Sequence, residues 1–396
     1  RSALVANTTG TQNVAVGASA LDANTTANNN IAIGHNSMGA TTTGSSNTAI
    51  GSQSLRTNTT GTQNTACGEQ ALMSATTASN NTAVGKAALE DNTTGAQNTG
   101  LGAFALSENT TASDNTAVGY QSLKVNTTGS DNTSLGHNSL VANTTGTQNV
   151  AVGSNALDAN TTANNNIAVG HNSLSANTTG TKNNALGVGA LTSNTTADNN
   201  TAIGHEALTA NTIGNGHVAV GTSALQKTTT ASNNVAIGYL SAEETTTGFA
   251  NISIGTQALQ ENTTAYGNIA IGYQSMMDGN AENFNTAVGY QAMKANTSGH
   301  SNVAVGGLAL DANTTANYNT AIGYKALTSN TTAERNTAVG MNSLELNTTG
   351  AYNTALGQGS LTNNTTASNN TGVGRGALNA TTTGASNTAI GYLALT

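Results

Sequence analysis

The stretch NTAVGYQAMKANTSGHS (residues 285–301) recurs with small changes along almost the whole chain. An Asn that opens the pattern Asn-(Thr/Val/Ile)-(Ala/Ser/Gly)-apolar-Gly returns at every seventeenth residue, from Asn13 to Asn387. This spacing gives 23 copies without an insertion or a deletion. We number each repeat from this Asn as position 1, so that Gly289 stands at position 5. His217 at position 1 and Asn184 at position 2 depart from the motif.

The composition is unusual for a chain of 396 residues. Charged residues make up 7%, aromatic residues 3%, and Pro and Trp are absent. Such a composition is typical of low-complexity disorder, but a strict period indicates a repeat architecture instead. The net charge of -8 provides no basic surface for nucleic acid. No apolar run approaches the roughly 18 residues that span a bilayer. Cys67 is the only cysteine, so no intrachain disulfide can form.

The five residues of the motif favour a short β-strand followed by a turn. Small and β-branched residues suit a strand, and side chains alternate between the two faces of a strand. Position 4 is apolar in every copy, so we predict that positions 2 and 4 face the core, with Leu or Met at position 9 as the second inward anchor. The predicted core residues are Val16, Leu21, Ile33, Val288 and Met293. The constant Gly at position 5 indicates a turn; examples are Gly17, Gly34, Gly51 and Gly289.

The remaining positions complete one coil of a solenoid. Asn-Thr-Thr at positions 12–14 is predicted to form a second short strand. A helix is the competing interpretation, but β-branched runs and repeated Gly oppose it, and helical repeats normally exceed about 30 residues. We therefore expect an all-β, parallel β-solenoid (β-roll) that fills residues 1–396 as a single domain. At about 4.8 Å per coil, its length would be on the order of 110 Å.

Columns of polar or small residues suggest how coils with so few apolar side chains are held together. We expect Asn at position 1 to stack as amide ladders between coils, as at Asn13, Asn30, Asn47 and Asn64. Position 3 is always Ala, Ser or Gly, and we expect it to face outward against another copy of the chain. The interface candidates are Ala15, Ala32, Ala49 and Ala287. The alternative is that position 3 is confined inside a narrow coil.

The repeat runs in phase to both ends of the sequence, without the atypical capping repeats that usually close a solenoid. Two interpretations stay open. The sequence is an interior piece of a longer fibre, or coils continue end to end between molecules, so that the homo-oligomer also polymerises.

Three segments, NNVAIGYLS (233–241), NNIAIG (29–34) and NNIAVG (165–170), resemble the head repeat of trimeric autotransporter adhesins, which reads Asn-Ser-Val-Ala-Ile-Gly. The chain is also similar to the Asn-Thr-Ala-Ile-Gly-Tyr-x-Ala-Leu repeats of bacterial and phage tail-fibre-like surface proteins. The resemblance implies a left-handed β-roll, three chains around one axis, and a place on the cell surface or on a phage or virion appendage. The adhesin repeat is shorter than the repeat of this chain, so the second half of each coil has no counterpart in it.

Side chains that could carry chemistry are scattered. His35, His137, His171 and His205 share position 6 on coils about 9–10 Å or more apart, which is too far for joint zinc ligation. No Ser-His-Asp arrangement can be assembled, so we expect no enzyme and no cofactor. The one weak calcium candidate is an acidic column at position 11, formed by Glu244, Glu261 and Asp278. Repulsion between solvated carboxylates is its alternative interpretation.

Two further patterns are worth testing. Asn-Thr-Thr is a formal glycosylation sequon, for example at Asn24, Asn92 and Asn313, although the ladder demands the same residues. The Thr columns at positions 13 and 14 are compatible with an ice-binding surface. However, consecutive residues cannot both face outward from a strand. The segment 277–284 is the one irregular coil.

These observations lead to two functional hypotheses. The first is a self-assembling, non-catalytic structural shaft of an extracellular fibre. The alternative is a β-solenoid module that binds a surface, a glycan or ice, with the ligand unknown. A binding face should present one aligned type of side chain, whereas position 6 changes from coil to coil, which favours the shaft.

Overall fold

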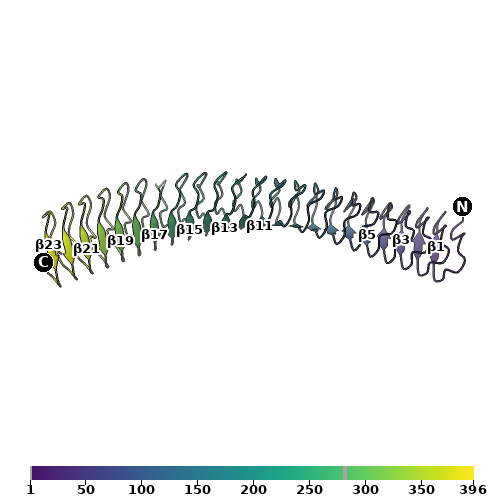
Figure 1. The fold of residues 1–396 in the computed structure, drawn as a ribbon, viewed down its shortest axis with the longest axis horizontal. Coiled ribbons are helices and arrows are strands. Elements are labelled where there is room, and N and C mark those ends of the chain that lie inside the picture. Colours follow the sequence, from purple (N-terminus) through teal and green to yellow (C-terminus); the bar gives the residue numbers. More distant parts are fainter. Residues whose placement is uncertain (1, 280–282) are drawn as a thin grey trace. The chain divides into compact units, whose positions relative to one another are not determined.

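The computed structural model describes residues 2–279 and 283–396. The chain forms two compact units, Arg1–Asn199 and Asn200–Thr396, and each is described by itself. In both units the described residues form stacked coils, each with one short strand and no α-helix (Figure 1). Over these residues, no helix could therefore cross a membrane. A single solenoid over residues 1–396 stays a prediction, and part of the irregular segment 277–284 lies outside the described residues.

The strands occupy positions 2–4 of every coil. Those of the first unit are β1 (Val14–Val16), β2 (Ile31–Ile33), β3 (Thr48–Ile50), β4 (Thr65–Cys67), β5 (Thr82–Val84), β6 (Thr99–Leu101), β7 (Thr116–Val118), β8 (Thr133–Leu135), β9 (Val150–Val152), β10 (Ile167–Val169) and β11 (Asn184–Leu186). Those of the second unit are β12 (Thr201–Ile203), β13 (Val218–Val220), β14 (Val235–Ile237), β15 (Ile252–Ile254), β16 (Ile269–Ile271), β17 (Thr286–Val288), β18 (Val303–Val305), β19 (Thr320–Ile322), β20 (Thr337–Val339), β21 (Thr354–Leu356), β22 (Thr371–Val373) and β23 (Thr388–Ile390).

Within each unit, neighbouring strands pair in parallel. Ala15 of β1 lies opposite Ala32 of β2, and Ala219 of β13 lies opposite Ala236 of β14. Each register is offset by one full repeat, so the same repeat position stacks above itself and forms a column. The parallel β-solenoid predicted from the repeat, with one coil per repeat, is confirmed.

The turn after each strand depends on Gly at position 5. Gly34 has a φ of 137°, and a Cβ atom there would lie 2.4 Å from the carbonyl oxygen of Gly51 in the next coil. Only Gly satisfies both conditions, because other residues avoid this φ and need space for a side chain. The predicted turn glycines Gly17, Gly34, Gly51 and Gly289 are confirmed.

Asn-Thr-Thr at positions 12–14 is a bend, so the prediction of a second strand was wrong. The side-chain Nδ2 of Asn58 donates to the carbonyl oxygen of Gly61 in its own coil across 3.1 Å. Such a local hydrogen bond turns the chain. The backbone N–H groups of Thr8 and Thr9 both donate to the carbonyl oxygen of Thr25, at 2.9 and 3.1 Å. Two consecutive donors on one acceptor do not form a strand ladder.

The interior is built from positions 1, 3, 8, 9, 12 and 15. Leu21 and Met293 at position 9 are fully buried, as predicted. Position 8 adds buried Ala or Ser, as at Ala20 and Ser37. In most coils the core is therefore one Leu or Met side chain among methyl groups and Asn amides; in one coil Ala242 takes the place of this side chain.

Candidate functional site

The strand presents its large side chains to the outside, which reverses the predicted orientation. Val16 is 56% exposed, Ile33 is 38% exposed and Val288 is half-buried. These three residues are not core residues. The alternation of the strand was correctly predicted, but its two faces were exchanged.

The predicted interface column faces inward instead. Ala32, Ala49 and Ala287 are completely buried inside their own coils, and Ala15 in β1 is half-buried. They cannot contact another copy of the chain, so the assignment of position 3 to an interface was wrong. The alternative, a position confined inside a narrow coil, is what the structure contains.

The width of the coil explains the reversal. Gly100 takes position 3 of its coil, and a Cβ atom there would lie 3.4 Å from the Leu89 side chain and 3.2 Å from the carbonyl oxygen of Ala105. Leu at position 9 thus fills the space opposite the strand and leaves room for about one methyl group. Val or Ile can be accommodated only on the outer face.

The outer face, formed by positions 2 and 4, is a regular surface that repeats in every coil of each unit; we call it the strand face. Position 2 is Thr, Val, Ile or, once, Asn184, and position 4 is Val, Ile, Leu or, once, Cys67. Neither position carries a charge in any copy of the repeat. Cys67 pairs in register with Ile50 on one side and Val84 on the other. The strand face is therefore an uncharged, largely apolar ribbon along each unit.

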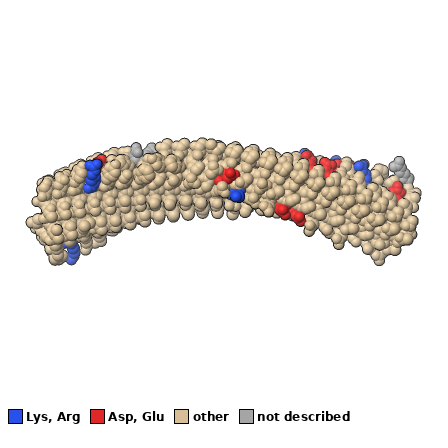
Figure 2. Space-filling view, in the orientation of Figure 1, with Lys and Arg blue, Asp and Glu red and all other residues tan. Residues whose placement is uncertain are grey.

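Large exposed apolar surfaces are rare on proteins that act alone. Charges elsewhere are sparse as well, and Figure 2 shows only a few charged side chains among uncharged residues on the face drawn. The strand face is accordingly the principal candidate surface for contact with another molecule.

Two Asn ladders fasten the coils together. At position 1, the Asn30 backbone N–H donates to Oδ1 of Asn13 across 3.0 Å, and its Nδ2 donates to the Gly44 carbonyl across 2.9 Å. Asn47 and Asn64 repeat both contacts. The predicted ladder is confirmed.

The second ladder, at position 12, contains the Asn residues of the glycosylation sequons. Nδ2 of Asn24 donates to Oδ1 of Asn7 across 2.8 Å, and Nδ2 of Asn313 donates to Oδ1 of Asn296 across 2.7 Å. Asn24, Asn92 and Asn313 are fully buried. A glycan on these nitrogens is incompatible with the folded coil.

The acidic column does not form a metal centre. Nζ of Lys227, one coil earlier at the same position, lies 2.5 Å from Oε1 of Glu244. Glu244 is therefore already paired with a cation. Among the residues that the structure describes, no three His, Cys, Asp or Glu side chains come together to hold a metal ion, and this applies to Glu244, Glu261 and Asp278.

The position-6 histidines His35, His137, His171 and His205 are exposed. His137 stacks on the ring of Tyr120, with 5.6 Å between the ring centres. Elsewhere, burial raises the pKa of Asp158. For Glu90, burial and then the neighbouring Asp91 carboxylate raise the pKa. Nδ1 of His205 lies 4.0 Å from Oε2 of the adjacent Glu206, and both side chains are exposed.

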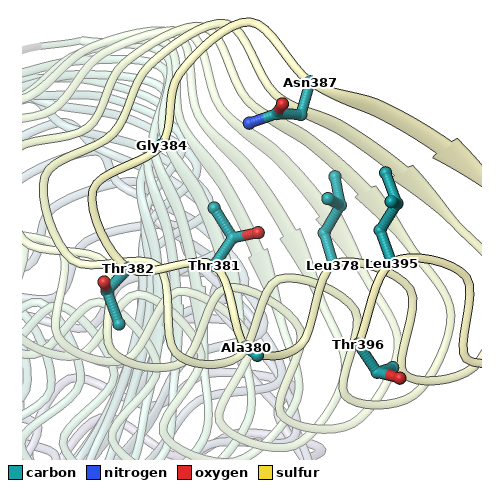
Figure 3. A pocket seen from close by; sticks show the side chains of 8 residues that line it. All are labelled: Leu378, Ala380, Thr381, Thr382, Gly384, Asn387, Leu395 and Thr396. Carbon is teal, nitrogen blue, oxygen red and sulfur yellow. The ribbon is translucent and has the colours of Figure 1, made fainter.

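One hollow lies over the final coil, with Leu378, Thr381, Asn387 and Leu395 directed toward it (Figure 3). These residues occupy positions 9, 12, 1 and 9, which are the core columns of every coil. None of the residues that line this hollow is titratable. The hollow is the coil interior seen end-on, and its lining offers no nucleophile activated by a base.

Sequence reasoning missed the strand face as a functional surface because it placed position 4 inside. The signal that could have revealed it is that position 3 holds only Ala, Ser or Gly, which marks the sterically restricted side of the strand. In comparisons with known proteins, no family model and no curated protein matches the chain.

Proposed function

We propose that the protein is a non-catalytic structural shaft of an extracellular fibre, assembled from copies of this chain that pack through their strand faces. The observation that carries this proposal is the uncharged ribbon of Val, Ile, Leu and Thr at positions 2 and 4. Three copies around one axis, as in the trimeric adhesin heads that the repeat resembles, would bury their three strand faces against one another.

The energetics support self-association. If each coil buries on the order of 50 Å² of apolar surface, the gain is about 1 kcal/mol per coil at about 25 cal/mol per Å². The contribution accumulates along the stack because the face repeats in every coil. A long, weakly apolar ribbon can thus hold a fibre together without any single strong contact.

Cys67 provides a direct test, since it stands at position 4 of the strand face. In a parallel trimer, the three Cys67 thiols would meet near the axis at one level. Oxidation with copper phenanthroline should convert two of every three chains into a disulfide-linked dimer on a non-reducing gel, while Cys67→Ser should give none. Light scattering should report three chains per particle. A single chain per particle, with no cross-link, would refute the proposal.

Ice binding is a second candidate, supported by the same surface. Positions 2 and 4 are two residues apart on one strand, so both ranks point outward, with coils about 4.8 Å apart. At positions 13 and 14, by contrast, the Thr59 hydroxyl donates to the Thr76 carbonyl, and only Thr60 of this pair is exposed. Thermal hysteresis and faceted ice crystals would support an ice-binding face. A shaft with its strand faces buried should show neither.

A further inference from the structure

The second unit carries a line of aromatic side chains just before its strands, at positions 16 and 17. Five of seven successive coils contribute an aromatic ring to this line, and the other two contribute His300 and Arg335. We call this line the aromatic strip; its members are Phe249, Tyr266, Phe284, His300, Tyr318, Arg335 and Tyr352. The same positions in the first unit hold small or polar residues such as Thr11, Asn28 and Gln97.

The members of the strip contact one another in two runs along the coil stack, one ending at Phe284 and the other beginning at His300. The rings of Phe249 and Tyr266 are parallel, with 4.7 Å between their centres, and Phe284 meets Tyr266 edge-on at 5.3 Å. Further along, the Arg335 guanidinium lies 5.5 Å from the ring centres of both Tyr318 and Tyr352, and donates to the Tyr352 hydroxyl across 2.6 Å. The strip is thus narrow and follows the stack.

Position 17 is an unfavourable place for bulky residues. Phe284, Tyr318 and Tyr352 have φ values of 65°, 60° and 60° there. Asn tolerates this left-handed conformation much better than aromatic residues do, and Asn29 and Asn80 adopt it in the first unit. These three side chains stay 60%, 51% and 53% exposed despite their contacts with one another's neighbours, so much of each ring faces solvent. Bulky rings that are exposed in a backbone conformation costly to them indicate a candidate functional surface.

The shape and charge of the strip restrict its partner. It is one or two residues wide and roughly 29 Å long at about 4.8 Å per coil, which suits a linear chain better than a globular protein. Arg335 and His300 are its only basic groups, and the net charge of the protein is -8, which disfavours nucleic acid. A neutral polymer with both apolar and hydroxyl surfaces fits.

We propose that the aromatic strip binds a neutral polysaccharide laid along the coil stack. The Phe284 ring covers Gly267, where a Cβ atom would lie 3.1 Å from the ring. Phe284 is 60% exposed, so part of its ring can stack on the C–H face of a sugar ring, in the way apolar groups pack on aromatic faces. The tyrosine hydroxyls and the Arg335 guanidinium supply hydrogen bonds to sugar hydroxyls. This inference goes beyond the shaft and does not depend on it.

The test is electrophoresis of the full chain in native gels that contain hydroxyethyl cellulose, laminarin, xylan or galactomannan, with alginate as the charged comparator. The binding variant is Phe284→Asn with Tyr318→Asn and Tyr352→Asn, which introduces the residue that the first unit already uses at this position. The control variant, Ile213→Thr with Leu346→Asn, removes exposed apolar side chains from positions 14 and 11.

We expect at least one neutral polysaccharide to retard the parent and the control equally, and to bind the triple variant at least tenfold more weakly. A milder variant, Tyr318→Phe with Tyr352→Phe, should lose only part of the retardation, and it serves as the test if the triple variant does not fold. Three results would overturn the proposal: no retardation by any neutral polymer, equal retardation of the triple variant, or retardation by alginate alone. A change of particle mass in the triple variant, without polysaccharide binding by the parent, would instead assign the strip to contacts between copies.

Discussion

The Nε2 atom of His217 donates a hydrogen bond to the carbonyl oxygen of Ala231 across 2.8 Å. Its Nδ1 atom accepts the backbone N–H of Asn234 at 3.3 Å. A neutral imidazole thereby makes both contacts that an Asn side chain makes at position 1 of other coils. The substitution preserves the ladder, but it introduces a titratable group into the core.

The first prediction concerns acid stability. Burial lowers the pKa of His217 from its ordinary value of 6.5. The unfolded chain therefore binds a proton that the folded chain excludes, and the stability due to neutral His217 is present above pH 6.5 and declines as the pH falls below it. Thermal unfolding followed from about pH 7.5 to about pH 5 should show this loss, and His217→Asn should reduce it. An unchanged pH dependence in the variant would contradict the assignment.

The second prediction concerns the turn glycines. Gly289 has a φ of 144°, and a Cβ atom there would lie 2.5 Å from the Gly306 carbonyl oxygen. We expect Gly289→Ala to destabilise the second unit by at least about 2 kcal/mol. Gly307→Ala is the matched control, because its Cβ would meet only the Tyr324 ring at 3.5 Å, and should change stability by less than about 0.5 kcal/mol. Urea unfolding of both variants makes the comparison; equal effects would show that the conformation at position 5 is not restrictive.

The third prediction ranks the two ladders. Oδ1 of Asn115 at position 1 accepts the backbone N–H of Asn132 across 3.0 Å, and its Nδ2 donates to Gly129. Oδ1 of Asn126 at position 12 accepts only the side chain of Asn143. Asn115→Ala should therefore cost about 2–3 kcal/mol and Asn126→Ala about 1–2 kcal/mol, since an orphaned buried backbone donor is expensive. Urea midpoints in the reverse order would contradict this ranking. The natural Ala75 at position 12 is consistent with it.

The fourth prediction concerns the strand face. Ile237→Lys with Ile322→Lys places two charges at position 4, where both side chains are exposed in a single chain. The coils should keep their fold, while self-association measured by light scattering should weaken at least tenfold, because each copy would bury two unpaired charges. Thr247→Lys with Thr332→Lys at exposed position 14 is the control and should leave the particle mass unchanged. The same particle mass in both variants would argue against an interface at the strand face.

Much of the fold could be read from the period. The offset of one repeat between paired strands, the turn at Gly34 and the ladder through Asn30 and Asn47 all follow from the regular columns of the sequence. The strand was also placed correctly at positions 2–4. The predicted second strand failed because the side chain of Asn58 satisfies its own coil, a local competition that a count of β-branched residues does not capture.

The sequence by itself determined that every coil is built on one plan and that strand side chains alternate. It did not determine which half of the alternation faces inward, because Ile33 and Ala32 are both compatible with either side of an isolated strand. Only the tertiary structure decided this, through the space left across the coil. Leu at position 9 occupies that space and leaves room for only about one methyl group at position 3. The larger side chains at positions 2 and 4 therefore lie on the outer face, where we propose that they act.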